Sequence, residues 1–424
     1  MKIVWLCNGM PLNEIVCGEY RISGGISWIS SSLESWYKRN EDKIYVLFPQ
    51  CEARESLWCE IENVQFIGFY QDKKWPWERS EKVVELFNAI LEEIQPDIIQ
   101  IWGTEYAHSV DMVSAAGERY KDHIVVHIQG LISVYARYYM ADLPWQIRCG
   151  FTFRDFFRGD NIWMQQRKYA LRGKNEIELL RKVNHVMGRT DWDNAHCLAI
   201  NPTLNYYYCN ETMRKEFGER AWSIGTIERY TIFITQGGYP IKGFHYFLEA
   251  LKILVKKFPQ LRVRVAGRCV LLDEKARIRE SSYNRYVRKY IVMNKLEQYI
   301  DFLGYQDAQG MVREFSRANV YVLPSAVENS PNSLAEAMLV GTPAVVADVG
   351  GVRSMMEHGK EGFIYPHNDP VLLAHYIERL FLDVKLSEEM ASCERKRANS
   401  DYDVKKNMDY QLEIYKELSY NNAK

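Results

Sequence analysis

The stretch Val322-Leu-Pro-Ser-Ala-Val-Glu328-Asn-Ser-Pro-Asn-Ser-Leu-Ala-Glu336-Ala-Met decides the fold. It joins a short apolar run, 320–323, to a helical pattern over 333–340. Ser330 suits the N-cap and Pro331 the first helical position, so we expect a strand, a loop and a helix start. The free N–H groups and the dipole of such a start favour an anion, for example a pyrophosphate.

Comparable strand–helix units recur along the chain, which indicates a parallel α/β fold. The predicted strands are 2–7, 44–48, 97–102, 124–128, 230–235, 261–265, 299–302, 320–323 and 344–346. The predicted helices include 82–94, 244–257, 309–317, 333–340, 370–382 and 403–419. Because 424 residues exceed one hydrophobic core, we expect two Rossmann-like domains, with 217–228 as the connection between them.

The bulk composition excludes several classes of protein. Lys plus Arg (54) nearly cancels Asp plus Glu (55), which argues against a nucleic-acid partner. The nine cysteines include no C-x-x-C pair, so reduced thiols are expected. No apolar stretch reaches 18 residues, and 3–7 is too short for the core of a signal peptide. We therefore expect a cytoplasmic protein.

Two carboxylate pairs leave alternatives open. Glu336 is placed to accept hydrogen bonds from vicinal hydroxyls such as those of ribose. It also stands at capping-box spacing from Ser333, which would make it a structural residue. Asp191 and Asp193 form a D-x-D pair, but two carboxylates are too few for a dedicated Mg²⁺ site. We interpret Asp191 as structural or acceptor-side and expect no metal and no cofactor.

Three blocks in order resemble one family. Glu328 and Glu336 form an E-x7-E pattern that resembles the donor site of family-four (group 1) retaining glycosyltransferases, which have the GT-B fold. The run 350–363, with its Gly-Gly pair, resembles a second block of that family. Tyr239-Pro-Ile-Lys242-Gly243 resembles its K-G motif. The likeness implies two domains facing across a cleft: 1–220 on the acceptor side, 221–402 on the nucleotide-sugar side, and a helix at 403–424 that returns to the first domain.

The resemblance also implies residue roles on the donor side. Lys242 would place a cation on the diphosphate, although a solvated surface lysine is the alternative. Glu328 would meet the transferred sugar, and Glu336 the ribose. The family commonly carries Arg where this chain has Gly237, so Arg268 is a candidate for the second cation. The remaining contacts to sugar hydroxyls and phosphate would come from the loop residues Asn329, Ser330, Pro331, Asn332, Ser333 and Leu334.

In the N-terminal half, Gly24 and Gly25 resemble the family's glycine loop, which lies against the donor phosphates and the acceptor. The resemblance therefore implies that they bind the donor, although a plain turn fits as well. Gln129 aligns with a family histidine that hydrogen-bonds the transferred sugar, and His127 is the alternative register. Glu105 follows a strand end, where it would touch the acceptor or cap a helix.

The segment 131–182 combines basic and aromatic residues. It has ten Lys and Arg against five acids, a local charge of +5, among many Tyr, Trp and Phe. This composition suits anionic headgroups or a lipid-diphosphate acceptor. It also suits a solvated face over a buried aromatic core, which is the commoner case. Peripheral contact with the inner face of the plasma membrane through this segment is the alternative that stays open.

The resemblance implies retaining, metal-independent transfer of a hexose-type unit from a nucleoside-diphosphate sugar to a glycan or lipid-linked glycan, in bacterial surface polysaccharide synthesis. In such enzymes the departing phosphate takes the acceptor's proton, so a glutamine at 129 is compatible with catalysis. Two alternatives stay open: a nucleotide-sugar epimerase of the same fold, and a non-catalytic scaffold in a glycan assembly complex.

Overall fold

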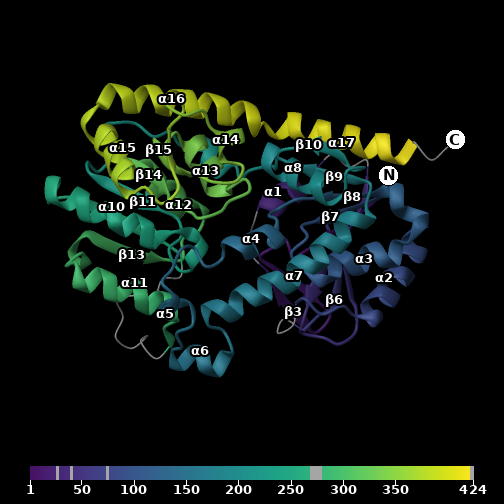
Figure 1. Ribbon diagram of the computed structural model, residues 1–424. Helices are drawn as coiled ribbons and strands as arrows, with labels where there is room; N and C mark the ends of the chain where they lie inside the picture. Colours follow the sequence, from purple (N-terminus) through teal and green to yellow (C-terminus); the bar gives the residue numbers. More distant parts are fainter. Residues whose placement is uncertain (25–27, 39–41, 73–75, 268–278, 421–424) are drawn as a thin grey trace. The chain divides into compact units, whose positions relative to one another are not determined.

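The computed structural model describes residues 1–24, 28–38, 42–72, 76–267 and 279–420 (Figure 1). The candidate residues Gly25 and Arg268 lie outside these ranges. The chain forms two compact units. Unit 1 comprises Met1–Val134, Tyr169–Arg214 and Tyr402–Lys424, and unit 2 comprises Tyr135–Lys168 and Lys215–Asp401. A segment from the first half of the sequence, Tyr135–Lys168, therefore belongs to the unit built mainly from the second half.

Within its described residues, unit 1 is built on an eight-stranded sheet in the order β10-β9-β8-β7-β1-β4-β6-β5. Every pairing is parallel except that of β5 with β6. A separate hairpin joins β2 to β3. The bounds are β1 Lys2–Cys7, β2 Glu14–Cys17, β3 Tyr20–Ser23, β4 Lys43–Gln50, β5 Leu57–Ile61, β6 Val64–Tyr70, β7 Ile98–Trp102, β8 Ile124–His127, β9 His185–Gly188 and β10 Asn205–Tyr208.

Helices cover both faces of this sheet. Val4 and Leu6 of β1 share a core with α2 and α3, whereas the alternate residues Ile3 and Trp5 share the opposite core with α1 and α17. This alternation follows from the two-residue period of a strand. The bounds are α1 Trp28–Tyr37, α2 Glu81–Ile94, α3 Ala107–Ala116, η1 Glu118–His123, α4 Ile132–Tyr138, α7 Ile162–Lys182, α8 Asp191–Ile200 and α17 Val404–Tyr420. The predicted return of the terminal helix to the first half of the chain is confirmed.

Unit 2 is built on a parallel sheet in the order β13-β12-β11-β14-β15-β16. The order reverses at β11, whose neighbours are β12 and β14. The loops that leave the carboxyl ends of β11 and β14 therefore lie at a topological switch point, where α/β sheets bind ligands. The bounds are β11 Thr231–Ile234, β12 Arg262–Ala266, β13 Ile300–Gly304, β14 Val320–Leu323, β15 Ala344–Asp348 and β16 Phe363–Pro366.

The helices of unit 2 include the short ones of the early segment, α5 and α6, which Figure 1 shows beside α11. Trp222 lies in the predicted connection 217–228, but its N–H donates to Val340 O at 2.8 Å, so this stretch packs within unit 2. The bounds are α5 Trp145–Arg148, α6 Phe153–Arg158, α9 Glu216–Glu219, η2 Pro240–Lys242, α10 Phe244–Lys257, α11 Ser282–Met293, η4 Glu297–Tyr299, α12 Ala308–Arg317, α13 Asn332–Val340, α14 Val352–Met355, α15 Pro370–Leu382 and α16 Val384–Asp401.

The observed architecture is the mixed α/β fold that the sequence predicts, with one Rossmann-like sheet in each unit. Among the described helices, none is both long and apolar enough to cross a membrane.

Candidate functional site

The loops at the switch point of unit 2 bring Lys242 and Glu328 together. Lys242 ends η2, shortly after β11, and Glu328 lies in the loop after β14. Lys242 Nζ donates to Glu328 Oε1 at 2.6 Å, and Ser325 Oγ donates to the same oxygen at 2.7 Å. Two residues 86 positions apart in the sequence, both predicted for the donor side, thus form one charged contact.

This contact is largely shielded from solvent, with the Lys242 side chain 22% exposed. Glu328 is 4% exposed, and the next residues of the loop, Asn329 and Ser330, are also buried. Burial by itself lowers the pKa of Lys242, but the neighbouring Glu328 carboxylate outweighs it, so the pKa of Lys242 is raised above its ordinary value. Lys242 is therefore a fixed, permanently charged cation rather than a solvated surface lysine.

Glycines allow the backbone to close around the pair. Gly350 has φ +54°, and a Cβ there would lie 1.6 Å from Glu328 O. Gly243 has φ +67°, and a Cβ there would lie 1.8 Å from Pro324 O. Gly351 N–H in turn donates to Asn329 O at 3.0 Å. The Lys-Gly and Gly-Gly blocks of the sequence thus hold the Glu328 loop in place from two sides.

The helix after this loop starts later than predicted. α13 begins at Asn332 and its N-cap is Pro331, so the assignment of Ser330 as N-cap and Pro331 as first helical residue is wrong by one position. Ser333 lies inside the helix, where its hydroxyl accepts a hydrogen bond from Tyr321 at 2.8 Å. The capping-box interpretation of Glu336 is therefore wrong. Glu336 is only 7% exposed, just over one turn into α13.

Tyr135 contacts the loop predicted for the donor side, which the sequence did not reveal. Its hydroxyl accepts the backbone N–H of Asn329 at 2.9 Å. Burial, and then the charge of Glu328, raises the pKa of Tyr135, so the phenol stays protonated. Tyr135 belongs to the segment Tyr135–Lys168, which packs within unit 2, and no local motif marks it.

Gly237 stands at the position where the resemblance would place a second cation, and it lies close to two apolar side chains. A Cβ at this position would lie 3.2 Å from Phe244 Cγ and 3.3 Å from Val265 Cγ1. These contacts are tighter than ordinary van der Waals contacts, so a larger side chain at position 237 would require Phe244 and Val265 to move by a few tenths of an ångström. The predicted replacement, Arg268, falls outside the described residues.

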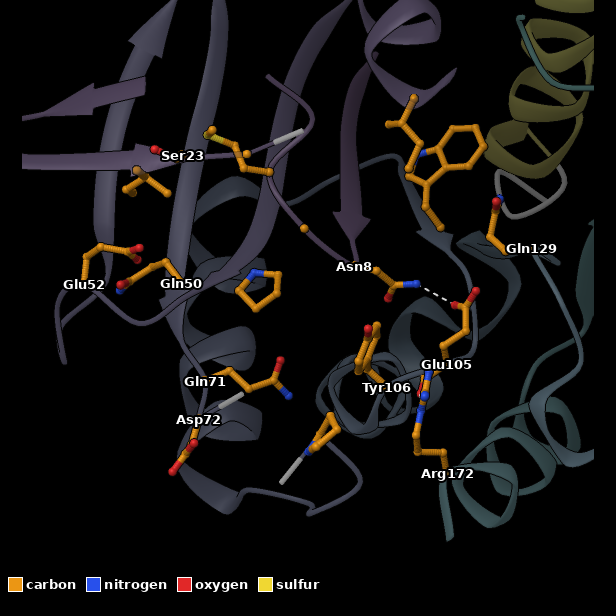
Figure 2. A pocket seen from close by; sticks show the side chains of 18 of the residues that line it. Asn8, Ser23, Gln50, Glu52, Gln71, Asp72, Glu105, Tyr106, Gln129 and Arg172 are labelled. Carbon is orange, nitrogen blue, oxygen red and sulfur yellow. Dashed lines mark hydrogen bonds between the residues drawn. The ribbon is translucent and has the colours of Figure 1, made fainter. Parts of the chain in front are cut away.

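Unit 1 contains a pocket of about 690 Å³, shown in Figure 2. It lies at the carboxyl ends of the central strands, the edge at which parallel sheets bind ligands. Three predicted residues line it: Gly24, Glu105 and Gln129. The other lining residues are Asn8, Gly9, Met10, Ile22, Ser23, Trp28, Ile29, Pro49, Gln50, Glu52, Gln71, Asp72, Pro76, Trp102, Tyr106 and Arg172.

Glu105 is placed by the loop that follows β7. Gly103 has φ +101°, and a Cβ there would lie 2.1 Å from Glu105 Oε2, so only glycine lets the carboxylate fold back. Asn8 Nδ2 then donates to Glu105 Oε2 at 2.5 Å, as Figure 2 shows. The N-cap of α3 is Tyr106, so the alternative role of Glu105 as a helix cap is wrong.

Burial sets the charge state of Glu105. It raises the pKa of this carboxyl to about 7, against the opposing effects of Arg172 and of the Asn8 hydrogen bond. Arg172 Nε also donates to Glu105 O at 2.5 Å. The carboxyl therefore changes its charge near neutral pH, inside a pocket large enough for a sugar.

His127 and Gln129 occupy different positions. His127 ends β8, is 1% exposed, and packs against Trp102 with ring centroids 5.1 Å apart. Burial lowers the pKa of His127 to about 3, so it is neutral. Gln129 Nε2 donates to His127 Nδ1 at 2.9 Å and lines the pocket. The register that puts Gln129 on the ligand side fits this geometry, and His127 orients it from behind.

Gly24 follows the β2–β3 hairpin and borders the same pocket. Its N–H donates to Asn13 O at 2.9 Å, and a Cβ would lie 2.2 Å from Leu12 O. The turn therefore requires glycine for packing, and it also exposes backbone to the pocket.

The D-x-D pair has a structural explanation. Asp193 forms a capping box with Thr190 at the start of α8. Asp191 is exposed and accepts a hydrogen bond from the Tyr208 hydroxyl at 2.7 Å. Neither lines the unit 1 pocket. Across the described residues, no group of three or more His, Cys, Asp or Glu side chains is arranged to hold a metal ion.

Several polar residues of the pocket were not predicted. Asn8 directly follows β1 and Gln71 directly follows β6, so their positions at strand ends are a signal that could have identified them. Arg172 lies in the long helix α7, and its approach to Glu105 depends on tertiary packing that no local pattern reports.

Residues 219–397 match the model of the family described as glycosyl transferases group 1. A Salmonella typhimurium protein named as a glycosyltransferase of colanic acid biosynthesis, WcaL, is 30% identical over 139 residues, which is 31% of each chain. For this protein and two other glycosyltransferase relatives, the match spans 31% to 48% of the relative's length. The resemblance to group 1 glycosyltransferases is thereby confirmed.

Solved structures identify the fold. A sucrose-phosphate synthase from Thermosynechococcus elongatus aligns over 98% of both chains, with a TM-score of 0.72 and 16% identity. The Anabaena protein Alr3699/HepE, solved in complex with UDP-glucose, aligns over 99% of both chains, with a TM-score of 0.65 and 17% identity. The predicted GT-B fold is confirmed.

Proposed function

Because residues 219–397 form a group 1 glycosyltransferase domain in a chain of GT-B fold, we propose that this protein transfers a sugar from a nucleoside-diphosphate sugar to a glycan or lipid-linked glycan acceptor. The observation that carries the proposal is the partly buried contact of Lys242 with Glu328 at the switch point of unit 2. One fixed cation beside one carboxylate supports an assignment of Lys242 to a diphosphate and of Glu328 to the transferred sugar.

Lys242 is the group that stabilises the leaving nucleotide. Its charge is maintained by Glu328 and its position by the Gly243 turn. Two helices, α10 and α13, begin in the loops beside it, and neither has a side-chain cap. Helix starts of this kind bind phosphate oxygens, so the diphosphate would be held without a metal ion.

The rest of the donor binds along the loop 329–334 and α13. Backbone groups of Asn329 to Leu334 contact the sugar and phosphate, and Glu336 accepts hydrogen bonds from the ribose hydroxyls. The solved HepE holds UDP-glucose, which makes UDP-sugars the first donors to test.

The acceptor binds in the unit 1 pocket. Trp28, Trp102 and Tyr106 offer apolar ring faces, and Glu105 and Gln129 offer hydrogen bonds, the combination that suits a sugar ring. Gln129 cannot shuttle a proton, so the departing phosphate takes the proton of the acceptor hydroxyl, with retention at the anomeric carbon.

The setting of the reaction follows from the relatives and from the segment 131–182. A relative named for colanic acid biosynthesis supports a role in bacterial surface polysaccharide synthesis. The basic and aromatic residues of 131–182 support a cytoplasmic enzyme that touches the inner face of the plasma membrane.

A direct assay tests the proposal. Purified protein is incubated with UDP-glucose, and then with other nucleotide-sugars, with and without glycan or lipid-linked acceptors. Nucleoside diphosphate should be released only when a donor and an acceptor are both present. Lys242→Ala should lower kcat by about a hundredfold or more, because one charge-stabilising donor is lost. Lys252→Ala removes an exposed lysine of α10 and is the matched control.

The other outcomes separate the alternatives. Interconversion of donor epimers without any acceptor would replace the transferase with an epimerase. Calorimetry that detects no nucleotide binding at all would support a scaffold. Equal activity of Lys242→Ala and Lys252→Ala would remove Lys242 from the mechanism.

A further inference from the structure

Large aromatic side chains project into solvent from the segment Tyr135–Lys168 of unit 2. We call this set the aromatic patch: Trp145, Phe151, Phe153, Phe156, Phe157 and Trp163. Their exposed fractions run from 48% to 74%. Large exposed apolar side chains this close together in the sequence, three of them in ring contact, point to an interaction site.

The centre of the patch is the outer face of α6. Phe153, Phe156 and Phe157 stand at helix positions i, i+3 and i+4, so their side chains leave the helix on one side. The rings of Phe153 and Phe157 lie 4.6 Å apart, and those of Phe156 and Phe157 lie 5.7 Å apart. The three rings form one continuous apolar surface.

The opposite face of α6 is anchored to the body of unit 2. Thr152 and Asp155 form a capping box, which fixes the start of the helix. Asp155 is fully buried, and its Oδ2 accepts the backbone N–H of Ser282, the first residue of α11, at 2.9 Å. Arg285 Nη2 donates to Phe151 O at 2.8 Å. The aromatic rings are therefore held outward by a fixed support.

The acids beside the patch are neutralised internally. Arg154 pairs with Asp155 at 2.9 Å and with Asp160 at 3.1 Å. Lys168 also pairs with Asp160, at 3.3 Å. These ion pairs neutralise the carboxylates of Asp155 and Asp160, which lie next to the aromatic patch in the sequence.

Two exposed arginines near the aromatic patch are available to pair with anionic groups of a partner. Arg158 directly follows Phe157, and the Arg167 guanidinium lies 6.0 Å from the Trp163 ring. Neither forms an ion pair with any residue in the described part of the chain. The segment therefore carries exposed apolar rings and two exposed arginines without an ion-pair partner among the described residues, and Arg167 lies against one of the rings.

We propose that the aromatic patch docks on an anionic lipid surface, with the rings in the boundary between headgroups and acyl chains and with Arg158 and Arg167 on lipid phosphates. Aromatic rings flanked by basic residues are the composition of interfacial anchors. A second copy of the chain is a poorer partner, because a twofold contact would bring the same arginines against each other.

The docking surface itself is independent of catalysis. It rests on the proposed function only in that a lipid-linked acceptor would be met at the membrane. Figure 1 shows α5 and α6 beside α11. Neither helix includes a residue of the switch-point loops of unit 2. Vesicle binding can therefore be measured without donor or acceptor.

Flotation of the full chain with vesicles tests the proposal. Vesicles of phosphatidylcholine alone are compared with vesicles that also contain about 30 mol% phosphatidylglycerol. The wild-type protein should bind the anionic vesicles preferentially, and added salt should weaken binding. The triple variant Phe153→Ser, Phe156→Ser, Phe157→Ser should lose about tenfold in affinity for each ring. The variant Arg158→Gln, Arg167→Gln should lose about fivefold for each arginine.

The matched control is Met293→Ser with Tyr305→Ser, which removes two side chains of unit 2 that are 80% and 79% exposed, outside the patch. It should bind vesicles like the wild type. Equal binding by the triple variant, or equal affinity for neutral and anionic vesicles, would overturn the proposal. A concentration-dependent dimer that the triple variant abolishes would overturn it in favour of a second copy. Nucleotide release with a short water-soluble acceptor should be the same in the triple variant, so a failure there would concern the proposed function instead.

Discussion

Glu336 is the side chain on which the ribose assignment depends. A buried carboxylate that accepts hydrogen bonds from ribose contributes about 2 kcal/mol, so Glu336→Ala should weaken nucleoside-diphosphate binding by about 30-fold in calorimetry. Glu314→Ala is the control. Glu314 lies in α12, is a similarly buried carboxylate of unit 2, and pairs with Arg264. Unchanged affinity in Glu336→Ala would show that the ribose is bound elsewhere.

Glu105 makes a pH-dependent prediction. Burial raises the pKa of its carboxyl to about 7, from an ordinary value near 4.5 that the unfolded chain keeps. The stability that this shift contributes is complete below pH 4.5 and is lost as pH rises through about 7. Glu105→Gln never ionises, so its melting temperature relative to the wild type should be higher at pH 8 than at pH 5.

The same titration should affect turnover. If the ionised carboxylate orients the acceptor, kcat/KM for the acceptor rises in the wild type as pH passes through about 7, and this inflection disappears in Glu105→Gln. A melting difference that does not change with pH, together with an unaltered rate profile, would contradict the assignment.

Site residues that stand in a local sequence motif could be predicted. Site residues that reach the site only through tertiary packing could not. Lys242 and Glu328 each stand in a recognisable local pattern, and the structure joins them at 2.6 Å. Tyr135 reaches the Asn329 N–H from a different part of the sequence, and Arg172 reaches Glu105 from a long helix. Such contacts depend on the tertiary placement of whole elements, which spacing does not encode.

Among the elements, the loops after β14 and β15 act as one unit. Gly350→Ala would place a Cβ 1.6 Å from Glu328 O and add strain at φ +54°. It should displace the Glu328 loop, lower stability by about 1–3 kcal/mol and weaken donor binding at least tenfold. Gly359→Ala has the same kind of strain, at φ +78°, but meets nothing within 4 Å. Calorimetry should therefore show an unchanged donor affinity for Gly359→Ala, and equal losses in both variants would refute the loop coupling.

The central strands were predictable because they are continuous apolar runs, as in β1, β7 and β14. β9 and β10 were not, because each has four residues and a mixed pattern: His185-Val-Met-Gly188 and Asn205-Tyr-Tyr-Tyr208. Short strands of this kind, β10 at the edge of the sheet and β9 beside it, are defined by their pairing partners more than by their own residues. The start of α13 was misplaced by one residue for a similar reason, since Ser330 and Pro331 both satisfy the local preferences of a helix start.

In the molecule as a whole, the two units do not follow chain order. Tyr135–Lys168 belongs to unit 2, and Tyr402–Lys424 belongs to unit 1. The apolar positions of α17 predicted a terminal helix that packs on a neighbour, and the family resemblance implied its return to unit 1. The transfer of Tyr135–Lys168 to unit 2 could not be predicted, because it is fixed by long-range contacts such as the Asp155–Ser282 hydrogen bond. Because the chain forms two compact units, we expect that a substitution can destabilise one unit and leave the other folded.

Tyr415 ties the C-terminal helix into unit 1. It is fully buried, its hydroxyl donates to Gln100 Oε1 at 3.0 Å, and Gln411 Nε2 donates to it at 2.8 Å. Tyr415→Ala should destabilise unit 1 by about 3–5 kcal/mol through the cavity it leaves, whereas Tyr415→Phe keeps the ring and should cost only about 1 kcal/mol. Hydrogen exchange should show faster exchange in β1 and β7 of the Ala variant, with unit 2 protected as before. Because the proposed nucleotide site lies wholly in unit 2, nucleoside-diphosphate affinity should stay unchanged while acceptor-dependent turnover falls. Loss of nucleotide affinity in Tyr415→Ala would mean that the two units do not fold separately.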